Sequence, residues 1–160
     1  MANSHSFRSG QQQLVQCPVD SGTVIEKGDI IWLDTDDVKP ASSVTWDTNL
    51  ATTQAALADA FVGIAAAPSA SGETDAIPVD VSADSVYEFT VASDTYMLGA
   101  PLGADKASGN ALLDQALEDA VAASSIAMAA EFKTAATTLL RVRFASAYNP
   151  SAANANASIG

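Results

Sequence analysis

The sequence predicts a mainly β protein, a small β-barrel or β-sandwich with one or two short helical turns and extended termini. Six segments alternate β-branched or aromatic residues with small or polar ones, as strands do. Glycine-centred turns, such as those at 27–29, 71–73 and 108–110, separate segments of the chain. Much of the 48% hydrophobic content is alanine, which buries little area per residue, so we expect a thin core that extends along strands.

The 160 residues suffice for one domain with a core of its own, whereas two independent cores would both be marginal. Residues 1–13 begin with a polar stretch that ends in glycine, and 147–160 is a run rich in Ala, Asn and Ser. Neither end has the composition of a core. We therefore expect an N-terminal arm over 1–13, a β domain over 14–146 and a flexible tail over 147–160.

The clearest strand is the last one, because its alternation has a period of two. Leu140, Val142 and Phe144 would lie on a buried face, and Arg141 and Arg143 on an exposed face. One further segment contains Pro78, which predicts an edge strand or a bulge because proline cannot donate to a ladder. The predicted strands are 12–19, 29–34, 61–66, 76–81, 86–91 and 138–145.

Two segments have helical character instead. In 111–121 the apolar residues recur at helical spacing among good helix formers, which predicts a short helix. The segment 53–60 is long enough for about two helical turns before the next strand. A weak internal repeat relates 59–66 to 123–130, since each precedes a short turn and a strand, and it is consistent with two similar hairpins.

The charge balance argues against nucleic-acid binding. Seven Lys and Arg against 19 Asp and Glu give a formal net charge of −12, which would repel a phosphate backbone. No stretch approaches 18 consecutive apolar residues and the N-terminus lacks a secretory pattern, so we expect no membrane contact and synthesis in the cytoplasm. Cys17 is the only cysteine and is expected to be a small buried hydrophobe.

The sequence offers little catalytic chemistry. His5 is the only histidine, and it lies in the predicted arm, where a surface role is the simpler interpretation. The densest acidic cluster is Asp34, Asp36 and Asp37, but these residues follow a strand and lack the spacing of a calcium loop. We therefore expect no enzymatic activity, no metal and no cofactor.

Five segments together resemble a known family. They are GDIIWL at 28–33, ADAFVGIA at 58–65, IPVDV…VYEF at 77–89, LGAPLGA at 98–104 and IAMAAEF…LLRVRF at 126–144. Their order is similar to that of the head-decoration (cement) proteins of tailed bacteriophages, of the β-tulip type. The resemblance spans about residues 14–145, and it is interrupted at 44–57, where the chain is longer and more polar.

The resemblance implies a virion protein on the capsid exterior that stabilises the assembled head, with the major capsid protein as its partner. It also implies a homo-oligomer, commonly a trimer, and no catalytic residues. Arms of this kind can order on a capsid lattice. In the predicted N-terminal arm and directly after it, Phe7, Arg8 and Leu14 are the candidate capsid contacts.

Two other classes remain open. One is a different virion β-structure, such as a tail or fibre component, although long repeats and heptads are not visible. The other is a small carbohydrate- or ligand-binding module, although Trp32, Trp46 and the other aromatic residues are scattered along the chain.

Overall fold

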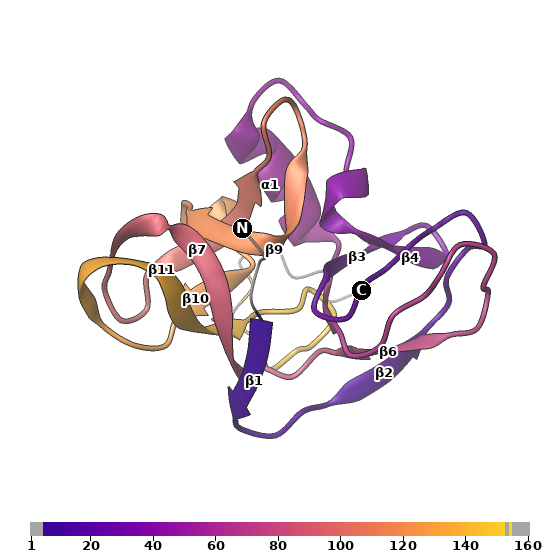
Figure 1. Cartoon of the computed structure of the whole chain (residues 1–160), viewed down its shortest axis with the longest axis horizontal. Helices are drawn as coiled ribbons and strands as arrows, with labels where there is room; N and C mark the ends of the chain where they lie inside the picture. Colours follow the sequence, from indigo (N-terminus) through magenta and orange to yellow (C-terminus); the bar gives the residue numbers. More distant parts are fainter. Residues whose placement is uncertain (1–4, 153, 155–160) are drawn as a thin grey trace.

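The computed structural model describes residues 5–152 and 154. Strands make up 46% of the chain and helix 11%, which confirms the mainly β prediction. In Figure 1 a β-barrel lies on the left, a five-stranded sheet on the right and one α-helix at the top. The elements are β1 His5–Ser9, β2 Leu14–Cys17, β3 Ile30–Asp34, β4 Asp37–Pro40, η1 Ala41–Ser43, α1 Leu50–Asp59, β5 Phe61–Ala65, β6 Ile77–Asp80, β7 Val86–Tyr96, β8 Pro101–Lys106, β9 Leu112–Asp119, η2 Ala122–Ser124, β10 Ala127–Ala129 and β11 Lys133–Phe144.

The barrel is closed by strand β7, whose two edges have different partners. One edge pairs with β11, from which the sheet continues through β10 and β8 to β9. On the other edge, Thr90 and Val91 pair in parallel with Ala116 and Leu117 of β9, and this pairing closes five strands into a barrel. The first half of that edge, Val86–Phe89, pairs with β1, which is an extra strand outside the closed ring.

The second sheet has the antiparallel order β2-β6-β5-β3-β4. Helix α1 lies between β4 and β5 in the chain, and its N-cap is Asn49, whose side chain accepts a hydrogen bond from Thr52 N at 3.0 Å. The buried Gln54 side chain donates to the carbonyl of Ala104 in β8 at 2.8 Å. The helix is thereby fixed against the barrel.

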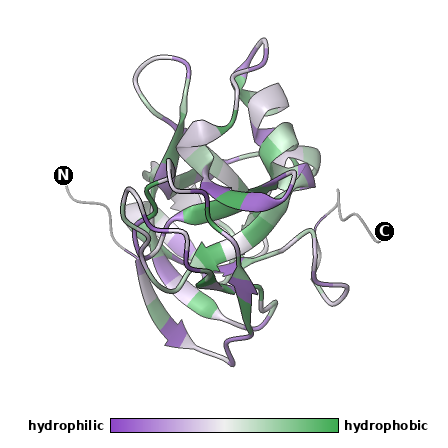
Figure 2. Ribbon diagram, turned by 90° about the vertical axis from the view of Figure 1, so that its right-hand side faces the viewer, coloured by the Kyte–Doolittle hydropathy of each residue, from purple (hydrophilic) through white to green (hydrophobic). Residues whose placement is uncertain are grey.

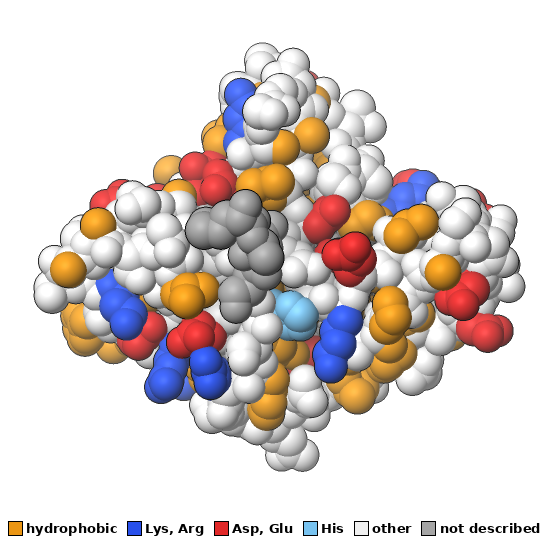
Figure 3. Space-filling model, in the orientation of Figure 1, with side chains coloured by type: hydrophobic (Ala, Val, Ile, Leu, Met, Phe, Trp, Pro, Cys, Tyr) orange, Lys and Arg blue, Asp and Glu red, His pale blue; other side chains and the backbone are white. Residues whose placement is uncertain are grey.

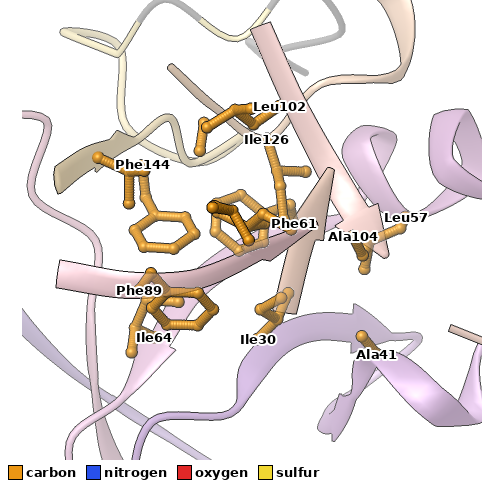
Figure 4. Packing of buried hydrophobic residues seen from close by; sticks show 14 of the residues in the cluster. Ile30, Ala41, Leu57, Phe61, Ile64, Phe89, Leu102, Ala104, Ile126 and Phe144 are labelled. Carbon is orange, nitrogen blue, oxygen red and sulfur yellow. The ribbon is translucent and has the colours of Figure 1, made fainter. Parts of the chain in front are cut away.

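The main core combines side chains from the inner face of the barrel with side chains from the second sheet and helix α1. In this core the ring centroid of Phe144 lies 5.9 Å from that of Phe61, 5.2 Å from that of Phe89 and 5.9 Å from that of Tyr87. Figure 4 shows the Phe61, Phe89 and Phe144 rings pointing toward one another. Figure 2 shows hydrophobic residues concentrated in the strands in the middle of the molecule. Tertiary packing of these strands therefore forms one continuous core.

A second, smaller cluster lies on the opposite face of the five-stranded sheet. It includes Ile31, Val62, Val79 and Cys17, which is buried as predicted. Because β5 is enclosed by both clusters, all of its residues are buried. Strands buried on both faces lose the simple alternation of a half-buried strand.

The predicted register of the last strand is confirmed. Leu140, Val142 and Phe144 are buried, while Arg141 and Arg143 are exposed. Each of the six predicted strands overlaps a strand of the structure, although β7 and β11 are longer than predicted, and all but the last residue of the predicted helix at 53–60 lies in α1. The two repeat units are both antiparallel pairs, β5 with β6 and β10 with β11, but they belong to different sheets.

The helix predicted over 111–121 is wrong, because this segment forms strand β9. Leu117 pairs with Ala104 of β8 on one side and with Val91 of β7 on the other. The opposite face of the strand also contacts protein, since Asp114 accepts hydrogen bonds from Ser42 of η1. Because both faces of the strand are in contact with protein, its apolar residues do not alternate, and their spacing resembles that of a helix. The pairing of β9 with β7 and β8 stabilises the strand more than helix propensity stabilises a helix.

Pro78 does not mark an edge strand, because β6 lies between β2 and β5. The β5–β6 ladder ends with Ala65 opposite Val79, so Pro78 falls just beyond it. Its carbonyl still accepts from Ala66 N at 2.9 Å. Proline has no N–H to donate to β5, and it is tolerated here because the β5–β6 ladder has already ended.

The described parts of both termini contact the body of the protein. Residues 5–9, which were expected in an arm, form β1 on the barrel sheet. In the predicted tail, Ala147 N donates to the carbonyl of Phe61 at 2.8 Å, and Asn149 Nδ2 donates to that of Val81 at 2.8 Å. Asn154 is buried and donates to the carbonyls of Ala58 and Ala145. Residues 1–4, 153 and 155–160 lie outside the described residues.

Candidate functional site

A cleft of about 530 Å³ is lined by residues of β1 and β2, two successive strands that belong to different sheets. Its walls come from the two sheets, because β1 and β7 belong to the barrel sheet and β2, β5 and β6 to the other. Figure 3 shows this face, with the only histidine near its middle and a basic side chain beside it. We call this hollow the inter-sheet cleft. Its lining residues are His5, Ser6, Phe7, Gln12, Leu14, Lys27, Ala65, Ala66, Pro78 and Tyr87.

Two of the three predicted contact residues meet in this cleft. Phe7 is 42% exposed, and its ring packs edge-on against Tyr87 with centroids 5.8 Å apart. Leu14 is 51% exposed and lies on β2, which pairs with the β6 strand that contains Pro78. The structure therefore brings Phe7 and Leu14 to one hollow from two different sheets.

Arg8 does not line the cleft. Its guanidinium forms a salt bridge with Glu88 of β7, with Nη2 2.7 Å from Oε1. Tyr87 and Glu88 are successive residues of β7 and point to opposite faces, so Phe7, which packs on Tyr87, and Arg8, which pairs with Glu88, lie on different sides of the sheet. Arg8 joins β1 to the exposed face of the barrel sheet.

The floor of the cleft is a buried hydrogen-bond network around Asp80. Tyr87 OH donates to Asp80 Oδ2 at 2.7 Å, and Gln12 Nε2 donates to the Tyr87 oxygen at 3.2 Å. Burial and the neighbouring Asp80 carboxylate raise the pKa of Tyr87 above its ordinary value. The phenol is therefore protonated near pH 7 and donates its hydrogen bond to Asp80.

The polar rim of the cleft is built on the turn at Gly28. This residue has φ of +96°, and a Cβ placed there would lie 2.1 Å from Nδ1 of His5. Glycine is thus required both for the backbone conformation and for the close approach of the His5 ring. Burial and the charge of Lys27 lower the pKa of His5, so the imidazole is neutral near pH 7. Lys27 is then the positive charge of the cleft.

A second apolar surface lies on the barrel. A hollow of about 260 Å³ is bordered by Pro101, Ala122 and Ala127, together with other small residues. Among the large exposed hydrophobic side chains, Met128 lines this hollow, Met97, Leu98 and Val121 precede lining residues by one or two positions, and Phe132 follows β10. We call this set the barrel patch: Met97, Leu98, Val121, Met128 and Phe132. Met128 stands opposite Pro101 on β8 and Arg143 on β11, so its side chain is on the outer face.

The acidic cluster noted in the sequence lies in a single hairpin turn. Asp34, Asp36 and Asp37 lie at the β3–β4 hairpin turn, and the Asp34 carboxylate forms a salt bridge with Lys39. Within residues 5–152 and 154, no group of three or more His, Cys, Asp or Glu side chains is arranged to hold a metal ion. In the same part of the chain, no helix is long and apolar enough to cross a membrane.

Sequence reasoning missed several residues of these surfaces. Gln12, Lys27 and Tyr87 come from a loop, a turn and a strand, and only folding brings them together. The segment 27–29 was predicted as a turn, but nothing in the sequence placed Lys27 beside His5. No pattern of spacing links the members of the barrel patch.

Comparison with known proteins gives no relative for this arrangement. No family model matches the chain, and neither a curated protein nor a solved structure matches it. The fold and its two apolar surfaces define the chain as a β-barrel protein with an attached five-stranded sheet.

A buried carboxylate beside the cleft predicts an unusual pH dependence of stability. Asp29 is only 4% exposed, accepts hydrogen bonds from Glu26 N and Gln115 Nε2, and has its pKa raised to about 6 by burial. The folded protein therefore holds a proton that the unfolded chain releases near the ordinary pKa of 3.8. The resulting stabilisation is present below that value and is lost as pH rises through about 6.

We expect Asp29 alone to lower the free energy of unfolding by about 2 kcal/mol between pH 4.5 and 7.5. Burial raises the pKa of Asp105, Asp114 and Glu118 in the same direction, whereas His5 acts in the opposite direction. Urea unfolding at the two pH values measures the change, and Asp29→Asn should flatten it. Stability that rises from pH 4.5 to 7.5 would contradict this role of Asp29.

Proposed function

We propose that this chain is a non-enzymatic structural protein of a virion that binds the outer surface of a tailed-bacteriophage capsid and stabilises the assembled head. Its partner is the major capsid protein. The resemblance of residues 14–145 to head-decoration proteins motivates this function, and the small β-barrel agrees with it.

The observation that carries the proposal is the pair Phe7 and Leu14 in the inter-sheet cleft. Exposed apolar side chains that are scattered singly are common on protein surfaces. Large ones that share one hollow, on a protein as acidic as this one, are typical of a contact site. Covering them with a partner removes apolar area from water. Apolar anchors that fill a recess often account for much of an interface energy.

The barrel patch supports a second part of the proposal, self-association as a homotrimer. It is separate from the cleft, because no residue lines both hollows. A trimer would present three clefts to the capsid, so that several weak contacts act together through their effective concentration. A protein that binds only the assembled lattice stabilises it by mass action.

Thermal disruption of undecorated phage heads tests this function. Adding the protein should raise the temperature at which the heads lose their DNA or dissociate. The double variant Phe7→Ala, Leu14→Ala should abolish most of the increase because it removes the large apolar side chain from each wall of the cleft. Val24→Ala is the matched control, since Val24 is 55% exposed but does not line the cleft. Heads that melt at the same temperature with and without the unmodified protein would reject the function.

A second candidate is a small carbohydrate- or ligand-binding module. The same cleft favours it, because the Phe7 ring, the Gln12 amide and the Lys27 ammonium border one hollow. Saturable binding of a small sugar or carboxylate by the isolated protein, without any effect on phage heads, would favour this candidate over capsid binding.

A further inference from the structure

We infer that the inter-sheet cleft receives an extended segment of its protein partner, which inserts an apolar side chain between Phe7 and Leu14 and places a carboxylate beside Lys27. The identity of the partner as a capsid protein rests on the proposed function. The chemistry of the segment rests on the walls, the charge and the strand edges of the cleft.

The walls select an apolar side chain. Phe7 and Leu14 face the hollow from opposite sheets, and Ala65, Ala66 and Pro78 complete its apolar lining. Phe7 is supported by the buried Tyr87, whose hydroxyl is fixed by Asp80, so this wall is held in place before anything binds. A preformed wall reduces the ordering cost of binding.

The charge selects a carboxylate. The chain has 19 acidic and seven basic residues, yet no carboxylate side chain is among the described residues that line the cleft. Lys27 is exposed there, and no carboxylate of the described residues lies within salt-bridge distance of it. The neighbouring His5 is neutral near pH 7 because its pKa is lowered. An incoming carboxylate would therefore meet a cation that forms no salt bridge with the described residues.

The strand edges favour an extended segment. β1 and β2 are the outermost strands of their sheets, so each has one edge without a strand partner in the described chain. On β2, the carbonyl of Gln13 accepts from Val81 N, and by antiparallel alternation the backbone groups of Leu14 and Gln16 point away from β6. An extended peptide can add to such an edge, whereas a helix has no backbone groups to offer.

Binding of full-length variants to undecorated heads tests the inference. Lys27→Glu should weaken binding on the order of tenfold because it replaces attraction by repulsion, and Lys27→Arg should bind like the unmodified protein. Leu14→Ala should weaken binding to a similar extent. The control is Lys106→Glu, which makes the same charge change at an exposed lysine that stacks on Trp46, away from the cleft. Equal unfolding free energies establish that the variants remain folded.

The outcomes separate the occupant from the function. If unmodified protein binds heads and both Lys27→Glu and Leu14→Ala bind equally well, the capsid function stands and this occupant of the cleft is rejected. If Lys27→Glu and Lys106→Glu weaken binding equally, the effect is general charge repulsion and the carboxylate at Lys27 is rejected. If the unmodified protein does not bind heads, the function and this occupant are both rejected.

Discussion

Phe144→Ala is expected to lower the free energy of unfolding by about 3–5 kcal/mol, the usual range for a buried aromatic residue. Phe144 is 5% exposed and contacts the rings of Phe61, Tyr87 and Phe89. These partners come from both sheets, so the vacated space cannot be closed by moving one strand alone. Chemical denaturation of the variant and the unmodified protein measures the loss.

The matched control is the neighbouring Arg143→Ala. Arg143 is exposed on the opposite face of the same strand, so its replacement should cost less than about 1 kcal/mol. Equal losses for the two variants would contradict the register of β11. A large loss for Arg143→Ala alone would indicate that Arg143, and not Phe144, faces the core.

Asp80→Ala is the second substitution with a large expected effect. The buried Asp80 carboxylate accepts four hydrogen bonds: Oδ1 from the backbone nitrogens of Gln13 and Ser82, and Oδ2 from the hydroxyls of Ser85 and Tyr87. Removing the carboxylate leaves these four donors without their acceptor in the interior of the protein. We expect a loss of about 3 kcal/mol or more in the free energy of unfolding.

Asp80→Asn provides the comparison. Its carbonyl can keep the two backbone donors, and its amide can donate to the Ser85 and Tyr87 oxygens, since hydroxyl groups also accept. The Asn variant should therefore lose clearly less stability than the Ala variant. If Asn and Ala were equally destabilising, the charge of Asp80 would matter more than its acceptor geometry.

The sequence predicted half-buried strands well and closure of the barrel poorly. In β11, one face meets the core and the other meets water, so Leu140 and Arg141 differ in a way that the pattern records. In β9, both faces contact protein, and its parallel pairing with Thr90 and Val91 joins distant parts of the chain. Local spacing carries no information about such a contact, and the segment was therefore predicted as a helix.

The candidate site was predictable only in part. Phe7 and Leu14 stood out as apolar residues in polar surroundings, and the structure places both in the inter-sheet cleft. Arg8 was also predicted as an anchoring side chain of the arm, but its salt bridge with Glu88, 80 positions away, holds it on another face. The description of 1–13 as a separate arm also missed that Gln12, Gln13 and Phe7 contact buried residues of the body. Deleting this segment would therefore disturb the fold.

Co-sedimentation with undecorated phage heads tests the central claim, that this β-barrel protein binds a capsid exterior. The unmodified protein should pellet with the heads and reach a fixed ratio to capsid subunits as its concentration rises. The Phe7→Ala, Leu14→Ala double variant, checked for its fold, should remain largely in the supernatant. Unmodified protein that stays in the supernatant at every concentration would contradict the claim.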